Sequence, residues 1–161
     1  TVIASNSQTI NANNTTVALP LWTITGVLEL YGFYGIVTTA VSSNITTAYI
    51  RLNDGTTQTN LSLNTGVTLS SFRVNSLINR SANLSNALGA TNSSTTAPTI
   101  IGSGLVDWPN NHCVAMVAKA GNTCNLEFVY TTTNTPASGA ITFYLRYKIL
   151  NDIAGGSVVA I

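Results

Sequence analysis

The stretch Val27-Leu-Glu-Leu-Tyr-Gly-Phe-Tyr-Gly-Ile-Val-Thr-Thr-Ala-Val41 carries apolar residues on both faces of an extended strand. One face holds Val27, Tyr31, Phe33, Val37 and Val41, and the other holds Leu28, Leu30, Tyr34, Ile36 and Ala40. A membrane helix is not expected, because it needs about 20 apolar residues and Glu29, Gly32 and Gly35 interrupt this run. A strand that is apolar on both faces must be covered twice, and in a chain of this size the second cover must come from a further layer or from a neighbouring subunit. The stretch therefore predicts a β protein that associates with itself.

The composition favours a single all-β domain. Charged residues make up 7% of the 161 residues, whereas an average soluble domain has about 25%. Disorder driven by charge is excluded, since 45% of the residues are hydrophobic. The abundant Thr and Asn are typical of exposed strands and their turns. Nucleic-acid binding is not expected either, because it needs a dense basic face and the six basic residues are scattered over Arg51, Arg73, Arg80, Lys119, Arg146 and Lys148.

The first twenty residues differ in pattern from the rest. Residues 1–20 are polar with weak alternation and end at Pro20, which predicts an extended N-terminal arm of the kind that lies across a neighbour. The start of the chain lacks the basic and apolar regions of a signal peptide, so secretion by the standard route is not expected. We expect residues 21–161 to form one β-sandwich domain, with a kink at Gly26 before the long strand.

The clearest turn signal is Asp54-Gly55, which predicts a hairpin with a two-residue loop. In that register Ile50 faces Thr59 and Ala48 faces Leu61, so the apolar residues of both strands share one side. After this hairpin the pattern weakens. We expect a strand from Gly66 with a bulge near Ser70-Ser71, a short helix within 75–90 and a loop over 90–98.

The last third of the chain predicts strand after strand. Segments 112–118 and 123–130 flank Lys119-Ala-Gly-Asn122, which indicates a hairpin. Residues 140–150 alternate strictly between apolar and polar, as in a half-buried strand. Residues 157–161 are expected to add a terminal strand. Eight to ten strands separated by turn signals predict an antiparallel β-sandwich of the jelly-roll type.

The cysteines and the single histidine give no convincing site. In the predicted hairpin Cys113 and Cys124 are about four residues apart along the strands, beyond the ~6 Å Cα separation of a disulfide, so we expect buried thiols. A zinc site from these cysteines and His112 lacks the paired spacing and a fourth ligand. A catalytic triad of Ser103, His112 and Asp107 is conceivable, but Gly102-Ser-Gly104 does not match a nucleophile elbow. We therefore expect no enzyme activity, no metal and no cofactor.

The aromatic residues allow two interpretations. Trp22, Trp108, Tyr31, Tyr34 and Tyr144 can form a stacking platform for a glycan, with Asn-rich and Asp-rich loops bonding to the hydroxyls. Alternatively, the two tryptophans are core or interface anchors, which is the interpretation that we favour.

Both ends of the chain resemble accessory virion proteins of tailed bacteriophages. The resemblance lies in Leu21-Trp-Thr-Ile-Thr-Gly-Val-Leu-Glu-Leu30, in Gly35-Ile-Val-Thr-Thr-Ala-Val41 and in Gly139-Ala-Ile-Thr-Phe-Tyr-Leu-Arg-Tyr-Lys-Ile-Leu150. In that family an apolar-Thr-Gly turn leads into a long strand ending near Gly-x-Val-Thr-Thr. The usual Pro before the last Leu is Ile149 here, and residues 42–110 match only in style.

The resemblance implies a head-decoration or head-fibre subunit on the capsid surface, commonly trimeric, which adheres to the major capsid protein or another virion protein and stabilises the shell. No catalytic or metal-binding residue is carried over from it. We expect the interface between subunits to involve Trp22, Tyr31, Phe33, Tyr34 and Tyr144. The alternative is a receptor-binding or glycan-binding module on a phage tail or fibre.

Overall fold

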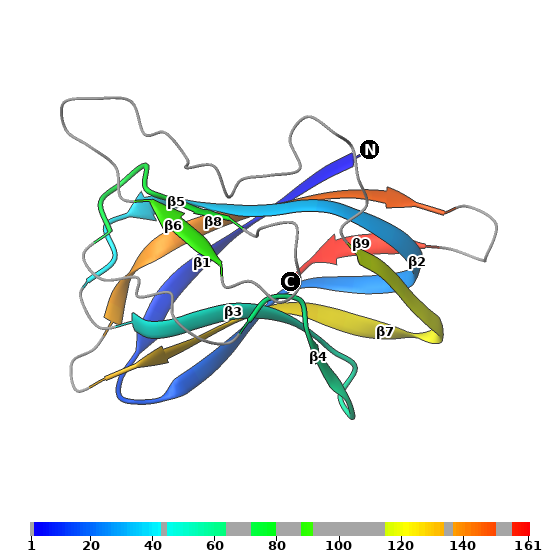
Figure 1. Ribbon diagram of the computed structural model, residues 1–161, viewed down its shortest axis with the longest axis horizontal. Helices are drawn as coiled ribbons and strands as arrows, with labels where there is room; N and C mark the ends of the chain where they lie inside the picture. The colour runs from blue at the N-terminus through cyan, green and yellow to red at the C-terminus, as the bar shows by residue number, and fades with distance from the viewer. Residues whose placement is uncertain are drawn as a thin grey trace.

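The computed structural model describes residues 2–42, 45–63, 72–79, 88–91, 115–133, 137–150 and 156–161. Throughout these ranges the regular structure is strand, and Figure 1 shows the arrangement. The strands are β1 (Val2–Ala12), β2 (Thr16–Thr39), β3 (Ile45–Asn53), β4 (Gln58–Asn60), β5 (Leu77–Asn79), β6 (Gly89–Thr91), β7 (Ala115–Thr132), β8 (Ala137–Ile149) and β9 (Ser157–Ala160). The pairs that these strands form are antiparallel, which confirms the predicted all-β antiparallel class.

The long strand β2 is the centre of the sheet. The main path runs β1-β8-β2-β7-β3-β4, while β5 and β9 also pair with β2, and β6 pairs with β5. Strands β5, β7, β8 and β9 thus hydrogen-bond to β2, which contains most of the apolar stretch Val27–Val41. The terminal strand predicted over 157–161 is confirmed as β9.

Strand β2 bends sharply in its middle. The rings of Trp22 and Phe33 meet edge to face with centroids 6.4 Å apart, although an extended strand would separate these two positions by about 36 Å. The bend lies at Gly26, which has a φ of 77° and follows a shift in the pairing register with β7. Figure 1 shows β2 and β7 turning together at this point. The predicted kink at Gly26 is confirmed.

The hairpin predicted at Lys119-Ala-Gly-Asn122 is wrong, because β7 continues through it as one strand. Lys119 pairs with Gly26, and Thr123 pairs with Thr25. Strand β7 therefore inserts residues 120–122 where β2 inserts none. The Gly-Asn signal marks a bend that β7 makes beside β2 and not a reversal of the chain.

A bulge at Tyr31 changes which side chains of β2 point inward. The register with β8 shifts between Leu30 and Gly32, so that it passes over Tyr31. Consequently Leu28 and Leu30 before the bulge are buried, as are Phe33 and Val37 after it. The prediction of two fully apolar faces is thus wrong: most of the large apolar residues share one face, and the single chain seals that face.

The first twenty residues are extended, as predicted, but they do not form an arm beside the domain. Strand β1 pairs with β8 along its whole length, from Val2 opposite Tyr147 to Ala12 opposite Ala137. Strand β2 then begins at Thr16 and runs past Pro20. The weak apolar alternation of this segment is sufficient for an edge strand, because Ile10 and Ala12 are buried in the common core.

The hairpin predicted around Asp54-Gly55 is confirmed, but its loop has four residues. Asn53 pairs with Gln58, so the register is displaced by two residues from the prediction. A shift of two keeps every side chain on its predicted face. The Asp54 carboxylate explains the longer loop, since its Oδ1 accepts hydrogen bonds from the backbone N–H groups of Thr56 and Thr57 at 2.9 and 2.7 Å.

The helix predicted within 75–90 is wrong where the structure describes it, because 77–79 form β5. Strand β6 follows at 89–91. The leucine spacing was compatible with a helix, but Asn and Ser favour other backbone hydrogen bonds. Several predictions fall outside the described residues: the bulge near Ser70-Ser71, the loop beyond Thr91, and Ser103, Asp107, Trp108, His112 and Cys113.

The core lies where β8 and β7 approach each other beside the bent β2. The rings of Phe128 and Phe143 have centroids 4.8 Å apart, and Phe143 also stacks on Phe33 at 5.6 Å. Strand β8 alternates as the sequence predicts, with one row of buried side chains. That row comprises Ile141, Phe143, Leu145 and Tyr147.

Candidate interaction surface

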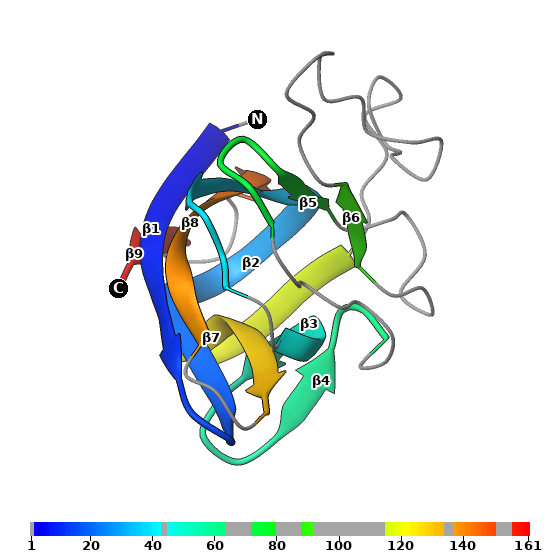
Figure 2. The ribbon, with the colours of Figure 1, turned by 90° about the vertical axis from the view of Figure 1, so that its left-hand side faces the viewer.

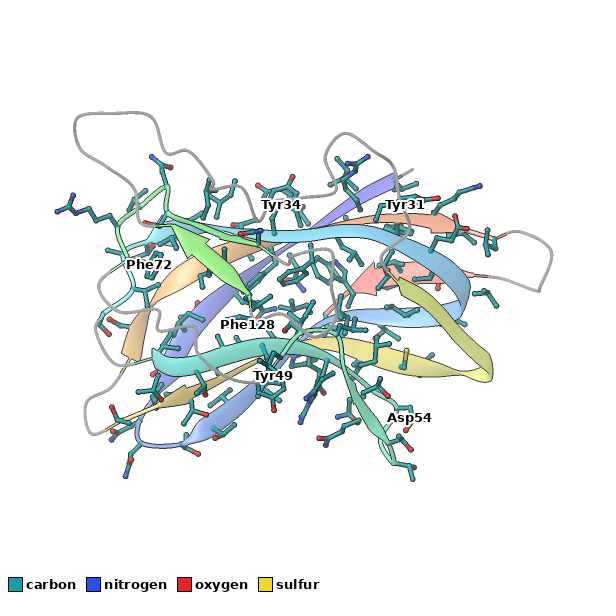
Figure 3. All side chains as sticks on the ribbon, viewed as in Figure 1. Tyr31, Tyr34, Tyr49, Asp54, Phe72 and Phe128 are labelled. Atoms are coloured by element: carbon teal, nitrogen blue, oxygen red, sulfur yellow. The ribbon has the colours of Figure 1, made fainter. Side chains whose placement is uncertain are left out.

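Two tyrosines stand side by side on the outer surface of the central strands. Tyr34 of β2 pairs with Tyr144 of β8, and their rings stack with centroids 4.8 Å apart at an angle of 11°. Both side chains are partly exposed. Figure 3 places Tyr34 and Tyr31 along β2, away from Phe128 between the strands. We call the surface formed by Glu29, Tyr31, Tyr34, Tyr144 and Arg146 the tyrosine face.

The stacking distance determines what the tyrosine pair can offer to a partner. It equals the spacing of about 4.8 Å between neighbouring strands, so the two rings stand upright and parallel. The facing sides of the rings cover each other, so a partner meets only the ring edges, the hydroxyls and the outer ring faces. Burial raises the pKa of Tyr34 above its usual value, as does the neighbouring Tyr144, while Arg146 lowers it. The Tyr34 hydroxyl therefore stays a neutral donor at physiological pH.

Charged groups of both signs lie beside the stacked rings. The Tyr31 hydroxyl donates a hydrogen bond to Glu29 Oε2 at 2.5 Å. On β8, Lys148 pairs with Glu29 and Arg146 pairs with Gly32. A Cβ added at Gly32 would lie 3.9 Å from Cβ and Cδ of Arg146, so the arginine stem passes over this glycine. Tyrosine and arginine together are the side chains that protein interfaces favour.

The structure divides the five residues expected at an interface into two groups. Trp22 is 0% exposed and Phe33 is 4% exposed, so both belong to the core of the chain and offer no surface to a partner. Tyr31, Tyr34 and Tyr144 lie together on the tyrosine face. A glycan platform that includes Trp22 is contradicted by this burial. Within the described residues, Trp22 Nε1 is a buried donor that lacks a hydrogen-bond acceptor.

A buried ion pair was not predicted from the sequence. Arg51 Nε on β3 lies 2.7 Å from Glu127 Oε2 on β7, and these side chains are only 14% and 7% exposed. Asn53 Nδ2 donates to Glu127 Oε1 at 2.9 Å, and Arg51 also donates to Gln58 Oε1 of β4 at 2.5 Å. Each charge is paired within the protein, and the cluster links the strands β3, β4 and β7 through side-chain hydrogen bonds. Only the β3–β7 register brings these residues together, so a local pattern cannot find them.

The described part of the chain contains no cluster of three or more His, Cys, Asp or Glu residues suited to a metal ion. Cys124 is buried on β7. The described ranges contain no helix of the length and apolar character needed to span a membrane. The chain matches no family model, no curated protein and no solved structure in the three comparisons that we made.

Proposed function

We propose that the chain is a structural virion protein of a tailed bacteriophage, a capsid decoration or head-fibre subunit that self-associates as a trimer and stabilises the shell. The tyrosine face is its contact surface. The observation that carries the proposal is the presence of three partly exposed tyrosines and an arginine on the central strands of a sheet. The assignment to a phage particle rests on the resemblance of both ends of the sequence to accessory virion proteins of tailed bacteriophages.

The low charge of the chain supports a packing role. With charged residues at 7% of the sequence, little electrostatic repulsion opposes the close approach of copies on a shell. Ring edges and hydroxyls offer area and hydrogen bonds at a small cost in side-chain entropy. The expected partners are other copies of the chain and the major capsid protein.

The finer architecture is part of the same proposal. A two-layered β-sandwich of the jelly-roll type is supported by the bend of β2, which brings Trp22 against Phe33. The contact between Phe128 and Phe143, from strands on opposite sides of β2, supports it as well.

The experiment combines subunit mass with shell stability. The double variant Tyr34→Ala/Tyr144→Ala should lower the mass measured by light scattering and should reduce the heat resistance that the protein confers on purified capsids. Tyr49→Ala is the matched control, because Tyr49 is a partly exposed tyrosine on the distant strand β3. If the double variant associates and protects capsids like the wild type, the tyrosine face is not the contact surface.

Glycan or receptor binding on a tail or fibre is the alternative outcome of this test. The upright stacking of Tyr34 and Tyr144 leaves little of the inner ring faces for a sugar. A glycan array that shows binding by the wild type, lost in Tyr144→Ala, would favour the alternative over capsid decoration.

A further inference from the structure

Strand β1 is a long edge strand that, within the described part of the chain, pairs on one side only. It lies at one end of the main strand path and hydrogen-bonds to β8 along its whole length. Every second backbone N–H and C=O of such a strand points away from the sheet. At 11 residues, β1 is about twice the usual strand length. The other end of the path, β4, has only three residues.

Within the described residues, strand β1 lacks the charges, prolines and bulges that usually prevent an edge from pairing with another chain. The segment Val-Ile-Ala-Ser-Asn-Ser-Gln-Thr-Ile-Asn-Ala contains no charged residue, no Pro and no Gly. The described pairing with β8 is unbroken by a bulge. Edge strands of monomeric proteins are usually short, charged or interrupted. An uncharged, regular edge of this length is built for pairing.

Strand β9 lies next to β1 on the same side of the molecule, as Figure 2 shows. Side chains join the two strands, since Asn6 Nδ2 and Gln8 Nε2 donate to the backbone oxygen of Ile161 at 3.1 and 3.3 Å. Ile3 on β1 is 55% exposed and Val159 on β9 is 57% exposed. Exposed apolar residues therefore flank the free strand edge.

We infer that β1 pairs antiparallel with β1 of a second copy of this chain, across a twofold axis at Ser7. In this register Ser5 lies opposite Thr9 and Asn6 opposite Gln8 of the second copy. At the end of the strand, opposite Ile3, the backbone N–H of Asn11 already donates to the Tyr130 hydroxyl at 3.4 Å and adds no bond to the second copy. The exposed hydroxyls of Ser5 and Thr9 then meet each other, and no charge is placed against a like charge, while the amides of Asn6 and Gln8 keep their hydrogen bonds within their own chain. A self-complementary strand favours a second copy over any other occupant.

The contact does not depend on the virion role. It has twofold symmetry, so it adds to the threefold association proposed above. A chain that makes both contacts forms a hexamer or a continuous layer. The twofold contact alone forms a dimer.

Introducing a charge at Ser7 tests the pairing directly. Ser7 is exposed and lies opposite itself across the proposed axis. Ser7→Lys and Ser7→Glu should each halve the mass measured by native mass spectrometry, because like charges then face each other. An equimolar mixture of the two variants should recover the wild-type mass with one copy of each per pair. Thr59→Lys, on exposed β4 at the other end of the path, is the control and should keep the wild-type mass.

Ser7 also exchanges a hydrogen bond with Thr142 at 3.0 Å, so a second variant avoids that contact. Ser5→Lys/Thr9→Lys places lysines opposite one another in the same register and should also halve the mass. Circular dichroism must show that each variant keeps the wild-type β signal. A wild type with an odd number of subunits, or variants with unchanged mass, would overturn the pairing, whereas loss of capsid protection alone would not.

Discussion

Gly139→Ala should destabilise the protein strongly, because the added methyl group would meet both a strained backbone and a neighbouring chain segment. Gly139 has a φ of 138°, and a Cβ added to it would lie 2.8 Å from the Val41 Cα and 2.9 Å from the Ala40 carbonyl oxygen. These backbone atoms cannot move away easily, because Val41 N donates to Phe72 O and Ser42 N donates to Ser138 O, both at 2.8 Å. Backbone strain costs about 1–3 kcal/mol, and the steric overlap costs about 1–3 kcal/mol more.

The expected loss is therefore about 4 kcal/mol in the free energy of unfolding, or about 8–16 °C in Tm for a chain of this length. Gly55→Ala is the matched control, since Gly55 has a φ of 87° but no atom within 4 Å of the added Cβ. Strain alone should cost the control about 1–2 kcal/mol. Urea denaturation at one fixed protein concentration measures both losses. Equal losses in the two variants would refute the close approach of Gly139 to the chain at Val41.

Two further predictions concern buried polar groups. Arg51→Ala should lower the free energy of unfolding by about 2–3 kcal/mol, because it leaves the Glu127 carboxylate buried without its cation. Adding Glu127→Gln to this variant should recover part of the loss. Additive losses of the two substitutions in urea denaturation would disprove the coupling. Burial raises the pKa of Tyr130 above its ordinary value of 10.0, although a hydrogen bond from the Asn11 backbone lowers it. As the pH rises, the unfolded chain therefore loses the Tyr130 proton before the folded chain does. The stability that the neutral Tyr130 hydroxyl gives to the folded state is complete below about pH 10 and disappears as the pH rises through the folded-state pKa. Tyr130→Phe should lose less stability than the wild type between about pH 9 and pH 11, and equal slopes would argue against burial as the cause.

Local patterns in the sequence were sufficient for the strands that have one clear face. Strict alternation predicted β8, and Asp54-Gly55 predicted the β3–β4 hairpin. The side chain of Asp54 then lengthened the loop, which changed the register by two residues without exchanging the faces. These features were accessible because each depends on residues close together in the chain.

Features that depend on pairing partners were missed. The bulge at Tyr31 reverses the alternation of β2. Gly32 and Gly35 indicate a bulge or a close backbone approach in this stretch, but they do not show which side chains turn inward. The Gly121-Asn122 turn signal is used for a bend because β7 stays paired with β2 on both sides of it. Trp22 and Phe33 were expected at an interface because the sequence does not show that β2 bends. The bend brings the two rings into contact inside the core. Tyr31, Tyr34 and Tyr144 keep accessible positions, and their role as contacts is a prediction.

Self-association is the central claim, and the mass of the protein in solution tests it most directly. Light scattering at micromolar concentration should give six times the subunit mass of 16.8 kDa when both proposed contacts form, and three times that mass when only the trimer contact forms and the β1 pairing fails. Tyr34→Ala/Tyr144→Ala should give a lower value. A wild-type protein that stays at the subunit mass over this range would contradict the proposal that copies of the chain bind one another.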